Sequence, residues 1–156
     1  MKQDIKIGFL QAAQKEQAIS LLARNFNTIS APDVIRTYFR DAEHEDSIIF
    51  AALSGDGEKL LGVAECAVMG TDYKLSFLAV DESHRGQGIG TALLRHVEAY
   101  AREHTAKENS LITLMDLTKR ENPSSRFYED RGYDAFWPYP ETSPILFKEL
   151  KSPRVM

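Results

Sequence analysis

The chain has 156 residues, of which 43% are hydrophobic and 27% charged, and its formal net charge is −4. This balance predicts one soluble globular domain over residues 1–156 and excludes a disordered chain. The acidic charge argues against a nucleic-acid partner, and no apolar run approaches the roughly 20 residues that span a bilayer. The single cysteine cannot form an internal disulfide and the N-terminus lacks a signal segment, so we expect a cytoplasmic protein.

The first third of the chain predicts one strand and two helices. Apolar residues alternate with polar ones at residues 4–10, as in a strand, and recur at helical spacing at residues 12–26. A serine cap and a first-turn proline predict a second helix at residues 30–41. In this helix, Tyr38 and Phe39 are either core residues or walls of a substrate pocket.

Three antiparallel strands are predicted next. Apolar runs at residues 47–53 and 59–68 flank a hairpin turn signal at residues 54–58. A third run, residues 75–80, ends in charged and turn-forming residues and is typical of a mostly buried strand.

A glycine-rich turn follows this third strand and leads into a helix. The turn reads Arg85-Gly86-Gln87-Gly88-Ile89-Gly90. The first turn of a helix has unpaired N–H groups and a positive dipole end, and glycines leave room for a phosphate. We therefore predict a pyrophosphate site here, with Arg85 as an additional ligand.

Two other phosphate-binding patterns fit this turn less well. A Walker A loop needs a lysine after its last glycine, and none follows Gly90. A dinucleotide fingerprint needs a glycine where Thr91 stands. That second alternative is supported only by Asp116, at the end of a later strand.

The rest of the chain predicts two helices and three strands. The helix from Ile89 spans about four turns, and we expect its charged residues, Arg95, Glu98, Arg102 and Glu103, to face solvent. Strands are predicted at residues 111–117, 133–139 and 145–150. A helix at residues 121–130 should end near Gly132 in a left-handed conformation. The order predicts an α/β fold with a mixed, mostly antiparallel sheet flanked by helices.

The glycine turn, the preceding Leu78-Ala79-Val80-Asp81 and residues 122–133 together resemble the GCN5-related N-acetyltransferase (GNAT) family. The resemblance implies the acyl-CoA N-acyltransferase fold, in which two central strands splay apart, and acetyl-CoA as the acetyl donor. It implies cofactor contacts by Leu78, Ala79, Val80, Arg85, Gly86, Gln87, Gly88, Ile89, Gly90, Thr91 and Asn122. Asn122 stands one residue later than the asparagine of the family, which leaves its contact open.

Acyl transfer to an amine needs a general acid and a base. The resemblance implies that Tyr128, four residues before Gly132, is the acid. Glu65 is the best candidate for the base, because it has the same strand parity as Leu61, Val63 and Ala67. We expect these residues to share one half-buried face of the strand, where burial would raise the pKa of Glu65. Asp116 and an ordered water remain alternatives.

Other reactive side chains give weaker signals. We expect His44 and His84 to be solvated, because each is a lone histidine beside charged residues. Cys66 lacks a companion for a Cys/His dyad, and no residues have metal-ligand spacing, so no metal is expected.

These features predict an enzyme that moves an acetyl group from acetyl-CoA to a primary amine by direct attack in a ternary complex. The acceptor is a small-molecule, peptide or protein amine, with no nucleic-acid or membrane partner, and the resemblance is consistent with a homodimer. The main alternative is a non-catalytic acyl-CoA-binding regulatory module. A nucleotide-binding dehydrogenase is a weaker one.

Overall fold

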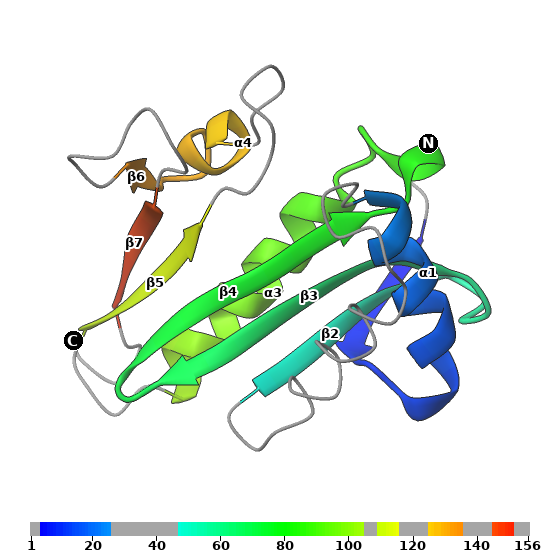
Figure 1. Ribbon diagram of the computed structural model, residues 1–156, viewed down its shortest axis with the longest axis horizontal. Helices are drawn as coiled ribbons and strands as arrows, with labels where there is room; N and C mark the ends of the chain where they lie inside the picture. Colours follow the sequence, from blue (N-terminus) through cyan, green and yellow to red (C-terminus); the bar gives the residue numbers. More distant parts are fainter. Residues whose placement is uncertain (1–3, 26–46, 105–108, 116–124, 136–144, 152–156) are drawn as a thin grey trace.

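The computed structural model describes residues 4–25, 47–104, 109–115, 125–135 and 145–151. In these ranges, one sheet has the strand order β1-β2-β3-β4-β5-β7-β6 (Figure 1). The strands are β1 (Ile5–Phe9), β2 (Ser47–Ser54), β3 (Leu60–Met69), β4 (Asp72–Val80), β5 (Asn109–Met115), β6 (Asp134–Ala135) and β7 (Ile145–Lys151). The helices are η1 (Ala12–Gln14), α1 (Lys15–Asn25), η2 (Glu82–His84), α3 (Ile89–His104) and α4 (Ser125–Glu129).

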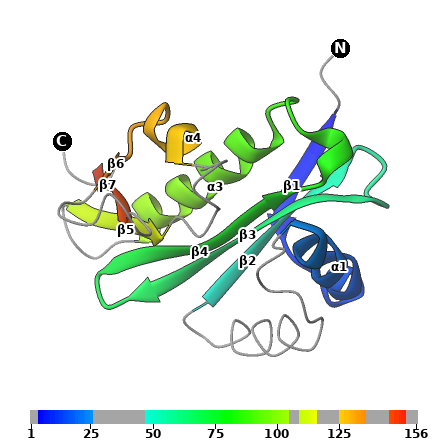
Figure 2. The ribbon, with the colours of Figure 1, turned by 45° about the horizontal axis from the view of Figure 1, so that its top comes forward.

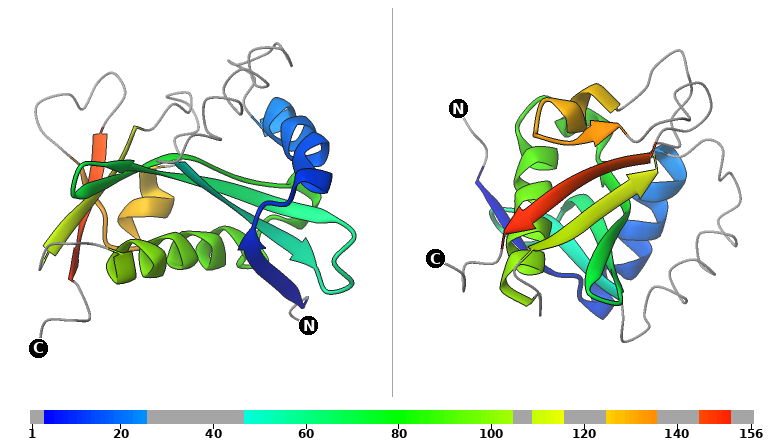
Figure 3. Two further views of the ribbon diagram at one scale, coloured as in Figure 1. Left: turned by 90° about the horizontal axis from the view of Figure 1, so that it is seen from below. Right: turned by 90° about the vertical axis from the view of Figure 1, so that its left-hand side faces the viewer.

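Helices cover both faces of this sheet. Helix α1 lies on one face, and α3 and α4 lie on the other (Figures 2 and 3). Each face has its own group of buried apolar residues: Leu21, Leu22 and Val63 on the α1 side, and Leu93, Leu94 and Ile112 on the α3 side. The central strands are buried on both faces, which explains their nearly continuous apolar runs.

The predicted fold class is confirmed. All strand pairs are antiparallel except β4 with β5, so the sheet is mixed and mostly antiparallel. The predicted strand at residues 111–117 is present as β5, which already includes Asn109, and residues 116–117 lie outside the described residues. The predicted helix at residues 30–41 lies outside the described residues.

A β-bulge divides β4 into two halves. The pairing with β3 steps from Glu65↔Phe77 to Cys66↔Leu75, so Ser76 is an extra residue in β4. Leu75 therefore packs in the α3-side core, whereas Phe77 packs in the α1-side core. Among the described residues, β4 pairs with β5 only at Tyr73 and Lys74, before the bulge. Beyond it the two strands part.

A second bulge lies in β3. The pairing with β2 steps from Ala52↔Gly62 to Leu53↔Leu60, which makes Leu61 the extra residue. Leu61 packs in the α3-side core, while Val63 packs in the α1-side core. The prediction that Leu61 shares a face with Glu65 was therefore wrong, because the bulge reverses the alternation.

Candidate active site

The edge of β4 that faces β5 carries backbone donors beyond the bulge. Asp81 donates its backbone N–H to Leu61 O at 2.8 Å, across the antiparallel pair with β3. Because donors alternate along a strand, the N–H of Ala79 also faces β3, and those of Leu78 and Val80 face the gap left by β5. Two of the three predicted backbone contacts are thus directed into the gap.

The glycine turn adopts the conformation that its sequence predicts. Gly86 and Gly88 have φ of +78° and +85°, and no atom lies within 4 Å of a Cβ added to either. The first intrahelical bond of α3 runs from Ala92 N to Gly88 O, so the N–H groups of the preceding three residues have no acceptor within the helix. Open space, unpaired donors and the helix dipole together suit an anion such as a pyrophosphate.

Arg85 and Gln87 are exposed in this turn. The Arg85 guanidinium donates to Asn25 Oδ1 at the end of α1, and its Nε lies 3.4 Å from Val80 O. Arg85 thus joins α1 to the end of β4 beside the turn.

His84 is paired, contrary to the expectation of a solvated side chain. Its Nδ1 lies 2.9 Å from Asp81 Oδ2, and Ser83 Oγ donates to the same carboxylate at 3.1 Å. Burial opposes ionisation of Asp81, but these hydrogen bonds outweigh it and lower the pKa of the carboxyl. Lys59 Nζ, at 3.8 Å, adds charge to the cluster. The cluster fixes the backbone between β4 and the glycine turn.

Tyr128 lies on α4, on the same side of the sheet as the start of α3 (Figure 2). It is 7% exposed and packs edge-to-face against Phe127 and Tyr133. The N–H groups of Arg131 and Tyr133 both donate to Tyr128 O, at 2.9 and 3.1 Å. Gly132 has φ of +94°, which confirms the predicted left-handed helix end.

Glu65 is 4% exposed and lies on the α1 side of β3, opposite Phe77. Burial raises the pKa of its carboxyl, and hydrogen bonds from Ser76 and Ser47 lower it by less. Within the described part of the chain, Oε2 has no hydrogen-bond partner. A buried carboxylate whose Oε2 has no partner among the described residues therefore lies beside the bulge at Ser76, where β4 separates from β5.

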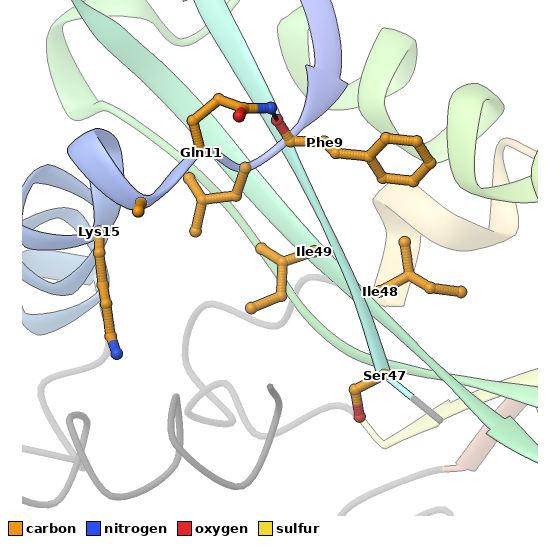
Figure 4. Close-up of a pocket in the computed structure, with 8 residues that line it drawn as sticks. Phe9, Gln11, Lys15, Ser47, Ile48 and Ile49 are labelled. Carbon is orange, nitrogen blue, oxygen red and sulfur yellow. Dashed lines mark hydrogen bonds between the residues drawn. The ribbon is translucent and has the colours of Figure 1, made fainter. Parts of the chain in front are cut away.

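A cavity of about 380 Å³ opens at the edge formed by β1 and β2 (Figure 4). Its lining includes Phe9, Gln11, Lys15, Ser47, Ile48 and Ile49. Ile49 and Lys15 lie on the α1 side of β2, and Phe9 and Ile48 lie on the α3 side (Figure 4). Ser47 also bonds to Glu65, so one wall of the cavity adjoins the candidate base.

Sequence reasoning missed a buried polar cluster behind Tyr128. Glu98, predicted to face solvent, is 4% exposed. Its carboxylate accepts from Tyr133 Oη at 2.8 Å and from Lys148 Nζ at 3.1 Å, and Lys148 Nζ also donates to Arg131 O at 3.0 Å. The only sequence signal was that Glu98 follows Leu94 by four positions and therefore borders the apolar stripe of α3.

Five residues singled out from the sequence lie outside the described residues: Asn122, Asp116, His44, Tyr38 and Phe39. Burial, with a contribution from Glu65, raises the pKa of Cys66 to about 12, which removes this thiol as a nucleophile at neutral pH. Across the described ranges, no three His, Cys, Asp or Glu side chains gather in a way that could hold a metal ion. None of the helices in those ranges is both long and apolar enough to cross a membrane.

Comparison with known proteins gives related sequences and structures. Streptothricin acetyltransferase of Streptomyces lavendulae is 30% identical over 95 residues, which cover 60% of this chain and 48% of the relative. The uncharacterized protein YdhI of Bacillus subtilis (strain 168) is 33% identical over 84 residues, which cover 54% of this chain and 48% of the relative. The chain thus spans about half the length of these curated relatives.

Solved structures share the fold. The crystal structure of an aminoglycoside 6'-N-acetyltransferase complexed with coenzyme A has a TM-score of 0.74 and 18% identity, over 94% of this chain and 96% of that one. The model of the acetyltransferase (GNAT) family matches residues 15–133, which is well over half of the chain. This protein, with its parted strands β4 and β5, its glycine turn and Tyr128 on α4, thus belongs to the GNAT acetyltransferase family, for which acetyl-CoA is the typical acetyl donor.

Proposed function

We propose that this protein is an N-acetyltransferase that moves the acetyl group of acetyl-CoA to a primary amine by direct attack in a ternary complex. The observation that carries the proposal is that β4 parts from β5 after Lys74 and then leads, through η2, into a glycine turn with open anion space. Acetyl-CoA supplies the thioester. A cytoplasmic location, a single domain over residues 1–156 and a homodimer remain predictions.

The backbone holds the donor in this proposal. The N–H groups of Leu78 and Val80 face the gap and are suited to bind an amide-bearing arm and to polarise a carbonyl. The N–H groups from Gly86 to Thr91 are suited to the pyrophosphate. Arg85 at the turn contributes positive charge.

Two side chains are proposed to move protons. Tyr128, buried on α4 against Phe127 and Tyr133, donates a proton to the departing thiolate. Glu65 accepts a proton from the amine, directly or through one water, because no described residue hydrogen-bonds to its Oε2 and burial raises the pKa of its carboxyl. Asp116 and ordered water are the alternative bases.

The acceptors to test first are small polycationic amines. Two related proteins are named for streptothricin and aminoglycoside acetylation. A net charge of −4 favours the approach of cations in general. Peptide amines form the second group, because the fold does not select the acceptor.

The test measures free thiol released from acetyl-CoA in the presence of each amine, with mass spectrometry of the acetylated product. Amine-dependent thiol release is expected with at least one acceptor. Binding of acetyl-CoA without release for any amine would instead support the non-catalytic regulatory module. The control is the Gly88→Val protein, which should neither bind nor react.

A further inference from the structure

Arg131 joins the helix that carries Tyr128 to the end of the glycine turn. Its Nε and Nη2 donate to Thr91 Oγ1 at 2.9 and 2.7 Å, and its Nη1 donates to Phe127 O at 2.7 Å. The guanidinium carbon also lies 3.9 Å from the centre of the Phe127 ring. Three charge-assisted hydrogen bonds and one cation–π contact thus come from a single side chain.

The two partners of Arg131 are neighbours of the proposed site. Thr91 is the third residue of α3 and belongs to the proposed pyrophosphate cradle. Phe127 directly precedes Tyr128, and a Cβ added to Gly90 would lie 3.4 Å from Phe127 Cζ. The Phe127 ring therefore packs directly on Gly90 of the glycine turn, and the Arg131 guanidinium packs on the same ring.

Capping of α4 does not account for this arrangement. A cap would need only the bond from Arg131, just after α4, to Phe127 O in α4. The other two N–H groups converge on a hydroxyl 40 positions away in the chain. Their geometry fixes the distance between two elements, because a guanidinium offers donors in a rigid plane.

We infer that Arg131 is a positioning residue that couples occupation of the pyrophosphate cradle to the placement of Tyr128. When an anion orders the first turn of α3, the bonds between Thr91 and Arg131 hold α4 at a fixed position relative to α3, so that the phenol of Tyr128 meets the departing thiolate. This inference rests on the proposed function, since it assigns proton delivery to Tyr128.

The test compares Arg131→Gln, Thr91→Val and the double variant with the parent. The matched control is Arg126→Gln, which removes an exposed arginine of α4 itself. Each protein is assayed with acetyl-CoA and with S-acetylpantetheine, which keeps the thioester arm but lacks the pyrophosphate. Thermal unfolding of each variant identifies any loss of the folded state.

With acetyl-CoA, kcat should fall roughly 10- to 100-fold in each single variant, the scale of a misplaced catalytic group, with a smaller change in KM. The double variant should be no slower than the slower single one, because both remove the same interaction. With S-acetylpantetheine, parent and Arg131→Gln should react at similar rates, because neither can use the cradle. Equal losses with both donors, or no loss with acetyl-CoA, would overturn the inference.

A second measurement covers the case in which S-acetylpantetheine does not react with the parent. Hydrogen exchange is followed with 3′-phospho-ADP, which carries the pyrophosphate without the thiol arm. Residues 125–133 should gain protection in the parent and not in Arg131→Gln, while residues 86–91 gain protection in both. Equal protection of residues 125–133 in both proteins would refute the coupling. A parent without amine-dependent thiol release would instead overturn the proposed function, and this inference with it.

Discussion

Replacing Gly62 by alanine should destabilise the protein and disturb the donor site together. A Cβ at this position would lie 2.8 Å from Leu93 Cδ1 and 3.0 Å from Ala79 O. Leu93 is fully buried, and Ala79 O belongs to the ladder between β3 and β4, so neither neighbour can move freely. Overpacking of this kind costs about 1–3 kcal/mol of unfolding free energy. For a chain of this size, each kcal/mol lowers Tm by about 2–4 °C, so a decrease of about 2–12 °C is expected.

The assay is thermal unfolding with and without acetyl-CoA. Because Ala79 lies between Leu78 and Val80, a displaced Ala79 carbonyl also moves the two N–H groups that face the gap, and acetyl-CoA should stabilise the variant less than the parent. The matched control is Gly8→Ala in the edge strand β1, where nothing lies within 4 Å of the added Cβ. This control should keep Tm or raise it slightly. Equal Tm values for the two variants would refute the packing argument.

Four further changes test the site and its support. Gly88→Val places a β-branched residue at φ of +85° and should abolish acetyl-CoA binding in calorimetry while the fold persists; binding like that of the parent would show that the cradle lies elsewhere. Tyr128→Phe should lower turnover about 10²-fold, and unchanged turnover under rate-limiting chemistry would remove Tyr128 as the acid. Burial raises the pKa of Glu65, and a base acts only when deprotonated, so the parent should gain activity as pH rises through that pKa. The Glu65→Gln variant should be slowest at neutral pH and should recover partly at high pH, where free amine is abundant. Because the folded-state pKa of Glu65 is raised, the neutral carboxyl stabilises the folded protein, and this stabilisation is lost as pH rises through that pKa. The unfolding free energy of the parent should therefore fall with pH relative to that of Glu65→Gln. Parallel pH profiles of the two proteins would contradict both statements. Lys148→Met leaves the buried Glu98 without its ammonium partner and should cost about 3 kcal/mol in urea unfolding, with the exposed Lys151→Met as an unaffected control.

Local patterns were sufficient to predict most of the described elements. The alternation in β1 and the apolar stripe of α3 each depend on neighbours within a few residues, and such neighbours are visible in a sequence. The glycine turn was predictable for the same reason, because positive φ at Gly86 and Gly88 is a property of single residues.

Features that depend on distant partners were not predictable. Ser76 looks like any polar residue of a strand, and only its pairing with β3 shows it to be a bulge. The continuous apolar run that follows it hides the change of face. Glu98 was misplaced because its partners, Tyr133 and Lys148, lie 35 and 50 positions away. The link between Arg131 and Thr91 is equally invisible, because no spacing rule connects them.

The edge of β4 beyond Lys74 has a consequence for the lifetime of the protein in a cell. Among the described residues this edge has no partner strand. A ligand that occupies the edge binds the folded state alone, and at a concentration 100 times its Kd it adds about 2.7 kcal/mol, or roughly a hundredfold fewer unfolded molecules. Proteases that degrade unfolded chains would therefore remove the protein faster when the acetyl donor is scarce. We expect its abundance to follow the supply of its own substrate.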